Sequence, residues 1–265
     1  MPVPGASAVP ERPRTARSEL PEPRHAVTSA SAAELTDDAG ATDTVSHDVT
    51  VTAPSLVIAA DAFNRTVTNG WGSSDTGGAW TNSSTASNFG VMDGAGTIKT
   101  AAGSGPSAYL NGVSGRDVDV ATSFGWDKAG TGGGMYASVV ARRNSTSDYR
   151  VKVIATATAT TLYLTRTVNG TETVLSSQAV SGLVYAPGDV LNVRFQAEGS
   201  STTTLRGKIW KTGTSEPSAW RLTSTDTTAS LQSAGSVGFY SYLSGSATNG
   251  PVTLIVQDVS VQKLN

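Results

Sequence analysis

Residues 134–155, GMYASVVARRNSTSDYRVKVIA, contain two segments in which apolar and polar side chains alternate, one on each side of the polar sequence NSTS. Alternation with a period of two is typical of β-strands, whose successive side chains point to opposite faces of a sheet. A short run of Asn, Ser and Thr is typical of a turn. The segment therefore predicts a hairpin of two antiparallel strands.

The same pattern continues on both sides of this hairpin. Downstream, TLYLTRTV and TETVLSS flank Asn169-Gly170, a pair typical of two-residue hairpin turns. No convincing helix of ten residues interrupts the pattern. About a dozen short strands in roughly 200 residues predict an all-β fold, a two-sheet antiparallel jelly-roll sandwich. The other strand patterns are DVDVATSFGW, DVLNVRFQA, TTLRGKIW, GSVGFYSYL and VTLIVQDVSVQ.

Alternation also divides the side chains between a core and an outer surface. The predicted core residues are Val139, Val151, Val153, Leu162, Leu164, Val193, Phe195, Leu205 and Ile209. If these strands share one sheet, their outward residues form a basic face with aromatic side chains between the cations, suited to an anionic glycan. The alternative is an ordinary solvated sheet surface. This predicted basic face comprises Tyr136, Arg142, Arg150, Lys152, Tyr163, Arg194, Arg206, Lys208 and Trp210.

Residues 1–55 differ from residues 56–265, which carry the strand patterns. They are rich in Pro and Arg up to His25 and then in small and acidic residues, so they offer few apolar groups to offset ordering entropy. TDTVSHDVTVTAP is the exception, because Val45, Val49 and Val51 alternate with polar residues. We expect an extended arm, disordered alone, whose one strand joins the main domain or another chain. A flexible leader is the alternative.

Several stretches of residues 57–262 resemble a known family when they are read in order. DAFNRTVTNGWGSSDTGGAW is followed by GGGMYASVVARRNSTSDYRVKV, APGDVLNVRFQAEG and TTLRGKIW, and the chain closes with VQDVSV. Together they resemble the concanavalin A-like, laminin-G-type jelly-roll modules of actinobacterial surface proteins and of the tail or fibre proteins of their phages. The resemblance implies a fold more than an activity, since such modules serve as lectins, adhesins, spacers and virion decorations.

Trp71 and Trp80 stand in the first of these stretches, among Gly, Ser and Thr. Their rings could stack on sugars, or they could close the open end of the sandwich, where glycines let the backbone approach closely. The structural role is favoured because the motif lies at the entry to the family's fold.

Calcium is a possible structural cofactor, since many jelly rolls of this type hold one through carboxylates and carbonyls. Asp61 and Asp258 are the candidate ligands, because the first and last strands of such folds usually pair. No dense acidic loop supports the site.

Composition argues against several other functions. The net charge of −2 provides no field that would attract nucleic acid or an anionic membrane. Cys is absent, and the only histidines, His25 and His47, lie in the arm, so residues 56–265 cannot form a Ser-His-Asp triad. The Glu-x-Asp-x-x-Glu pattern of related retaining glycosidases is missing. We therefore expect no enzyme activity.

The N-terminal segment has arginines but no apolar run behind them, so we expect no export signal. A phage protein needs none, because assembly takes place in the host cytoplasm. These features predict a virion accessory protein, such as a fibre, minor tail or capsid-decorating protein. Residues 1–55 would bind other virion proteins in a multi-copy or homo-oligomeric assembly, and the jelly roll would contact host cell-wall glycans. The alternative is a bacterial cell-surface carbohydrate-binding or adhesion module.

Overall fold

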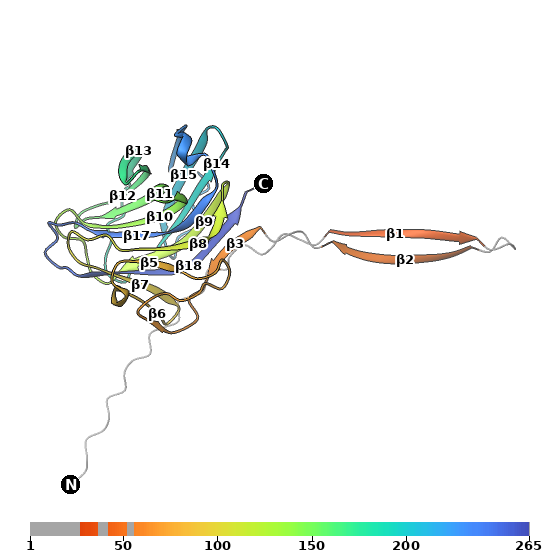
Figure 1. Cartoon of the computed structure of the whole chain (residues 1–265), viewed down its shortest axis with the longest axis horizontal. Helices are drawn as coiled ribbons and strands as arrows, with labels where there is room; N and C mark the ends of the chain where they lie inside the picture. The colour runs from red at the N-terminus through yellow and green to blue at the C-terminus, as the bar shows by residue number, and fades with distance from the viewer. Residues whose placement is uncertain (1–26, 37–41, 52–55, 265) are drawn as a thin grey trace, which may run out of the picture. The chain divides into compact units, whose positions relative to one another are not determined.

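The computed structural model describes residues 27–36, 42–51 and 56–264. The chain divides into two compact units, Met1–Ser55 and Leu56–Asn265. Figure 1 shows strands in both units, and the helical elements of the described residues are two 3-10 turns, η1 (Ala86–Asn88) and η2 (Ala229–Leu231). No helix in this part of the chain is long and apolar enough to cross a membrane.

The N-terminal unit contains a β-hairpin. Strand β1 (Val27–Thr36) pairs antiparallel with β2 (Thr42–Val51), which includes the strand predicted from the sequence. The strand was expected to pair with the main domain or another chain, whereas its partner among the described residues is β1. Strand β1 is rich in Ala and Ser, which have low strand propensity, so its sequence predicted no strand. The rest of the arm lies outside the described residues.

The larger unit is a sandwich of two antiparallel sheets, as predicted. The seven-stranded sheet has the order β13 (Thr171–Ala179), β12 (Thr160–Val168), β11 (Ser147–Ala155), β10 (Met135–Asn144), β17 (Gly235–Leu243), β8 (Ser107–Gly115), β5 (Thr81–Ser83). The nine-stranded sheet has the order β16 (Leu222–Asp226), β15 (Thr203–Lys211), β14 (Leu191–Glu198), β9 (Val118–Trp126), β18 (Val252–Lys263), β7 (Ala95–Thr100), β6 (Phe89–Met92), β4 (Val67–Thr68), with β3 (Val57–Asp61) also paired to β18.

The core lies between the two sheets. All nine core residues predicted from alternation are buried, which confirms that part of the analysis. Strand β14 shows the reason, because Leu191, Val193, Phe195 and Ala197 are buried while the residues between them are partly exposed. Apolar area removed from water contributes roughly 25 cal/mol per Å², so each sheet is held by the face that it turns toward the other.

An aromatic cluster from the segment between β3 and β5 fills one part of this core. Trp71 packs edge-on against Trp80 at 4.9 Å between ring centroids and against Phe239 of β17 at 6.0 Å. Its indole N–H donates to the carbonyl of Thr97 in β7 at 2.9 Å, so one side chain contacts both sheets. A methyl group at Gly96 would lie 2.9 Å from the Trp71 ring, which explains the glycine there.

Candidate functional site

A groove with a volume of about 530 Å³ lies on the outer surface of the seven-stranded sheet. Every strand of that sheet contributes to its lining, because outward side chains of adjacent strands lie side by side. The groove lining comprises Ser83, Gly105, Ser107, Tyr109, Tyr136, Arg143, Ser145, Thr146, Asp148, Arg150, Lys152, Thr167, Gly170, Glu172, Tyr240 and Tyr242.

Four tyrosines provide the aromatic surface of the groove. Tyr136 and Tyr242 are paired across β10 and β17, and their rings meet edge-on at 5.2 Å. Tyr240 lies against the backbone at Gly105, where a methyl group would be 2.1 Å from the phenol oxygen. Burial raises the pKa of Tyr136 and of Tyr240, so both hydroxyls stay protonated at neutral pH and remain hydrogen-bond donors.

Two of the groove's three cations are paired with acids. Arg150 holds Asp148 with two hydrogen bonds of 2.6 and 2.9 Å, and its guanidinium stands over Tyr240 at 4.8 Å. Burial acts to lower the pKa of Arg150, but the hydrogen bond and the negative charge of Asp148, with smaller contributions from Tyr109 and Glu172, together outweigh it and raise the pKa. Lys152 forms an ion pair with Glu172 from β13. The two pairs therefore carry little net charge.

The third cation, Arg143, has no such partner among the described residues. Its guanidinium lies over the ring of Tyr109 at 3.9 Å from the centroid. It enters the groove because β10 has a bulge between Ala141 and Asn144, where Arg142 adopts a φ of 51°. A bulge inserts a residue and re-aims the side chains that follow it.

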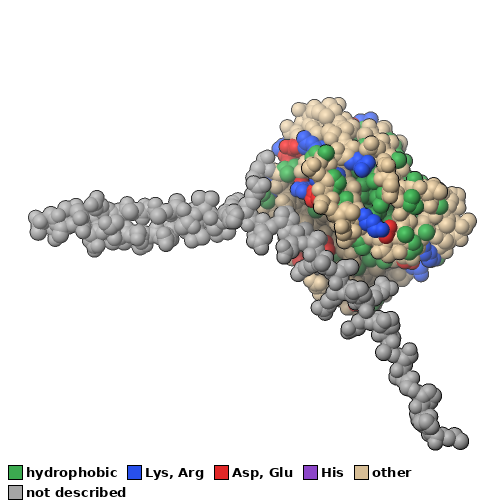
Figure 2. Space-filling view, turned by 180° about the vertical axis from the view of Figure 1, so that it is seen from behind, with side chains coloured by type: hydrophobic (Ala, Val, Ile, Leu, Met, Phe, Trp, Pro, Cys, Tyr) green, Lys and Arg blue, Asp and Glu red, His purple; other side chains and the backbone are tan. Residues whose placement is uncertain are grey.

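The structure does not bring the nine residues of the predicted basic face together. The premise of one sheet was wrong, because β10, β11 and β12 belong to one sheet and β14 and β15 to the other. Figure 2 shows Lys and Arg side chains scattered over the visible face, several beside acidic ones, instead of merged into one surface. Tyr136, Arg150, Lys152 and Tyr163 lie on the seven-stranded sheet, whereas Arg194, Arg206, Lys208 and Trp210 lie on the nine-stranded sheet.

The basic residues of the predicted face that lie on the nine-stranded sheet are neutralised by acids. Arg194 binds Asp119 at 2.8–3.0 Å and Glu216 at 3.0 Å. Lys208 also pairs with Glu216, at 2.7 Å, and Arg206 with Glu198 at 2.8 Å. Burial acts to raise the pKa of Glu216, but the bonds from the two cations outweigh it and lower the pKa. This surface is an ion-pair network and not a cationic face.

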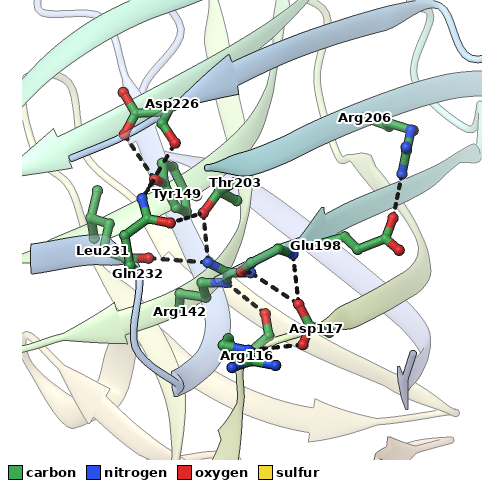
Figure 3. A network of polar contacts seen from close by, with 11 residues as sticks. Arg116, Asp117, Arg142, Tyr149, Glu198, Thr203, Arg206, Asp226, Leu231 and Gln232 are labelled. Carbon is green, nitrogen blue, oxygen red and sulfur yellow. Dashed lines mark hydrogen bonds and ion pairs between the residues drawn. The ribbon is translucent and has the colours of Figure 1, made fainter. Parts of the chain in front are cut away.

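Arg142 lies inside the protein, so its assignment to the predicted basic face was wrong. It is completely buried and donates to the carbonyls of Arg116 (2.5 Å), Gly199 (2.8 Å) and Leu231 (3.2 Å). Figure 3 shows it at the centre of a polar network that also includes Thr203, at 2.6 Å. The same bulge that turns Arg143 outward turns Arg142 inward. Burial lowers the pKa of Arg142.

Two carboxylates of this network predict a loss of stability in acid. Burial acts to raise the pKa of Asp117 and of Asp226, but hydrogen bonds, led by the Gly199 and Thr228 backbone N–H groups respectively, outweigh it and lower both values. A lowered folded pKa stabilises the fold above the unfolded value of about 3.9, and this stabilisation is lost as the pH falls through the folded value. We expect the free energy of unfolding, measured by guanidinium denaturation, to decline between pH 5 and pH 3. The decline should be smaller for Asp117→Asn, and an equal decline in the variant would contradict this role of Asp117.

The candidate calcium ligands do not form a cation site. Strands β3 and β18 do pair, but both oxygens of Asp61 are used by Arg65 at 2.7 and 2.8 Å and by the Trp80 indole N–H at 2.7 Å. Asp258 adopts a φ of 47° at an irregularity in β18. No group of three or more acidic or histidine side chains suited to a metal occurs in the described part of the chain. The donor set therefore does not fit calcium.

Trp71 and Trp80 are both buried, at 0% and 6% exposure, so neither ring is available to a sugar. Trp80 is fixed by Asp61 and Trp71 by the Thr97 carbonyl. These contacts place both tryptophans in the core and not at the rim of a sugar-binding site.

The groove contains two carboxylates, Asp148 and Glu172. The register places Thr167 opposite both residues, so their Cα atoms are separated by two strand spacings, roughly 10 Å. Glycoside hydrolysis requires one carboxyl group that donates a proton and a second that acts as base or nucleophile. Both groups here form ion pairs with cations of the groove, Asp148 with Arg150 and Glu172 with Lys152.

Among the aromatic and cationic residues of the groove, four were absent from the predicted site: Tyr109, Arg143, Tyr240 and Tyr242. A signal was available for two of them, because GFYSYL alternates, and placing Phe239 in the core turns Tyr240 and Tyr242 outward. Arg143 could not be found in this way, since the bulge reverses the parity of β10. Tyr109 follows two small residues of β8, Ser107 and Ala108, and the start of this strand gives no alternation of buried and exposed residues.

Comparisons with known proteins identify the fold. No family model and no curated protein matches the chain. The carbohydrate-binding module CBM66 from Bacillus subtilis is 17% identical over 69% of this chain and 95% of its own, with a TM-score of 0.50. A β-glucanase from Bacillus licheniformis is 11% identical over 80% of this chain and 100% of its own (TM-score 0.54), and a β-1,3-glucanase from Mycobacterium marinum is 11% identical over 79% and 100% (TM-score 0.50). These likenesses confirm a jelly roll and, at such identities, show the fold alone.

Proposed function

We propose that this jelly roll binds carbohydrate in the groove of the seven-stranded sheet and has no catalytic activity. The observation that carries the proposal is the groove itself, which crosses all seven strands and presents four tyrosines among hydroxyl groups and cations. Aromatic faces stack on the apolar faces of sugar rings, while hydroxyls and charged groups bind sugar hydroxyls. This mixture suits a polysaccharide better than an apolar small molecule.

The comparisons support binding without deciding between binding and hydrolysis. CBM66 is a carbohydrate-binding module, and the two glucanases share the fold, so the fold serves both classes. The chemistry of the groove favours binding, because its two carboxylates are tied to Arg150 and Lys152. Incubation with the bound polysaccharide should release no reducing ends. Release that disappears on changing Asp148 or Glu172 would reverse the proposal.

Tyr242→Ala is expected to weaken glycan binding by about tenfold or more, because buried aromatic anchors contribute most of the energy of such sites. Isothermal titration calorimetry would measure the change against whichever polysaccharide a glycan array identifies. Trp210→Ala is the matched control, since it removes an aromatic side chain from the other sheet. Equal losses from both changes, or none from Tyr242→Ala, would place the binding site elsewhere.

We extend the proposal to a virion accessory role, in which residues 1–55 attach the protein to other virion proteins in many copies and the jelly roll is displayed. The division into two units supports it, because attachment and display need separable parts. Mass spectrometry and cryo-electron microscopy of phage particles from the source host would test it. Absence from particles, together with recovery from a cell surface, would favour a bacterial adhesion module.

A further inference from the structure

The charges of the groove do not cancel. Its lining contains Arg143, Arg150, Lys152, Asp148 and Glu172, three cations against two acids. Each acid is bound to one cation, Asp148 to Arg150 and Glu172 to Lys152. The excess positive charge therefore resides on one identified side chain, Arg143.

The surroundings of Arg143 leave its hydrogen-bonding edge free for a ligand. No described residue accepts a hydrogen bond from its guanidinium or forms an ion pair with it. The group is nevertheless held in place, because it lies 3.9 Å from the centroid of the Tyr109 ring. Stacking covers the flat face of a guanidinium and leaves its N–H fork in the plane. Hydroxyl groups of Ser107, Ser145 and Thr146 belong to the same groove.

Arg143 and the tyrosine pair lie at opposite ends of one strand. Both Tyr136 and Arg143 belong to β10, seven positions apart, which corresponds to roughly 20 Å of strand. Tyr136 meets Tyr242 at its end, and Tyr240 lies between the two ends, paired with Ser138. A ligand that contacts both ends is therefore a chain of several sugar units.

We infer that the groove recognises an acidic polysaccharide, with an oxyanion of one sugar unit, a carboxylate or a phosphate, bound by Arg143 while neighbouring units lie along the tyrosines. This inference rests on the proposed carbohydrate-binding function and names its ligand class. An Arg fork binds carboxylate and phosphate in the same two-point manner, and such charge-assisted bonds are about twice as strong as neutral ones. The site requires the anion to be part of a sugar chain, because Arg143 alone is a single contact.

Two pairs of polysaccharides test the inference with the full-length chain. The first pair is polygalacturonate and its fully methyl-esterified form, and the second is a phosphate-bearing mannan before and after phosphatase treatment. Within at least one pair we expect the acidic form to bind about tenfold more tightly, which is typical of one added charge-assisted hydrogen bond. The pair that shows the difference identifies the oxyanion.

Arg143→Gln should abolish the preference for the acidic form, so that the acidic and neutral forms of a pair bind with equal affinity. Lys99→Gln is the matched control, since it removes the same charge from an exposed position of β7 on the other sheet. A preference that survives Arg143→Gln, or that Lys99→Gln also removes, overturns the inference. Failure of every acidic form to bind overturns it as well, and binding of neutral glycans would then leave the proposed function intact. If the protein binds no glycan at all, both the inference and the proposed function are contradicted.

Discussion

Replacing Arg142 by methionine is expected to lower the free energy of unfolding by about 3–5 kcal/mol, the cost typical of breaking a buried charged network from one side. The side chain is fully buried and donates to three backbone carbonyls, so its removal leaves those groups without donors away from water. Asp117 would also lose its contact with the guanidinium, at 3.4 Å. Guanidinium denaturation followed by tryptophan fluorescence measures the change.

Arg143→Met is the control for this prediction. The two arginines are adjacent in sequence, but the Arg143 guanidinium faces the groove, and among the described residues it contacts the Tyr109 ring without an ion pair or hydrogen bond. Its replacement should change the free energy of unfolding by less than about 1 kcal/mol, as expected of partly exposed surface residues. Similar losses from the two variants would show that Arg142 is not the centre of the network.

Asp61→Ala is expected to cost about 3 kcal/mol, since it leaves the Trp80 indole N–H without its acceptor and removes the ion pair of Arg65, which keeps only the Trp71 carbonyl among its described hydrogen-bond acceptors. Asp61 is buried, and Trp80 packs against Trp71, so the loss should extend to the aromatic cluster. The wavelength of maximum tryptophan fluorescence should also change, because the surroundings of Trp80 change.

Asp75→Ala is the matched control, because this exposed carboxylate accepts one hydrogen bond, from the Ala62 N–H. It should cost no more than about 1 kcal/mol.

Thermal unfolding of the unaltered protein tests the predicted calcium site. EDTA and added calcium should leave the thermal midpoint of the unaltered protein unchanged, because the Asp61 oxygens are already occupied. A midpoint that falls with EDTA and recovers with calcium would restore the metal site.

Alternation allowed the sequence to predict the strands and their inward residues. Val151 and Val153 lie in the core as expected, and Arg150 and Lys152 point outward from the same strand. Such information is local, because it depends only on the two-residue repeat of an extended chain. The pairing of β3 with β18, the first and last strands of the sandwich, was also predicted, but from the resemblance to a family and not from the alternation pattern.

Local alternation could not assign strands to sheets. Strands β11 and β14 have the same pattern of inward Val and outward Arg, yet they lie in different sheets, so Arg150 and Arg194 do not belong to one surface. Sheet membership depends on which distant strands pair, and outward residues carry little information about that choice. The predicted basic face failed for this reason.

The sequence by itself determined that this protein is a sandwich of antiparallel strands and which side chains form its core, because burial of alternate apolar residues leaves few other arrangements. The tertiary structure alone decided where the groove lies. It placed four tyrosines from three strands, β8, β10 and β17, beside the cations of β10 and β11. It also turned Arg142 into the core and Arg143 into the groove, through a bulge that depends on the strands paired to β10 on both sides.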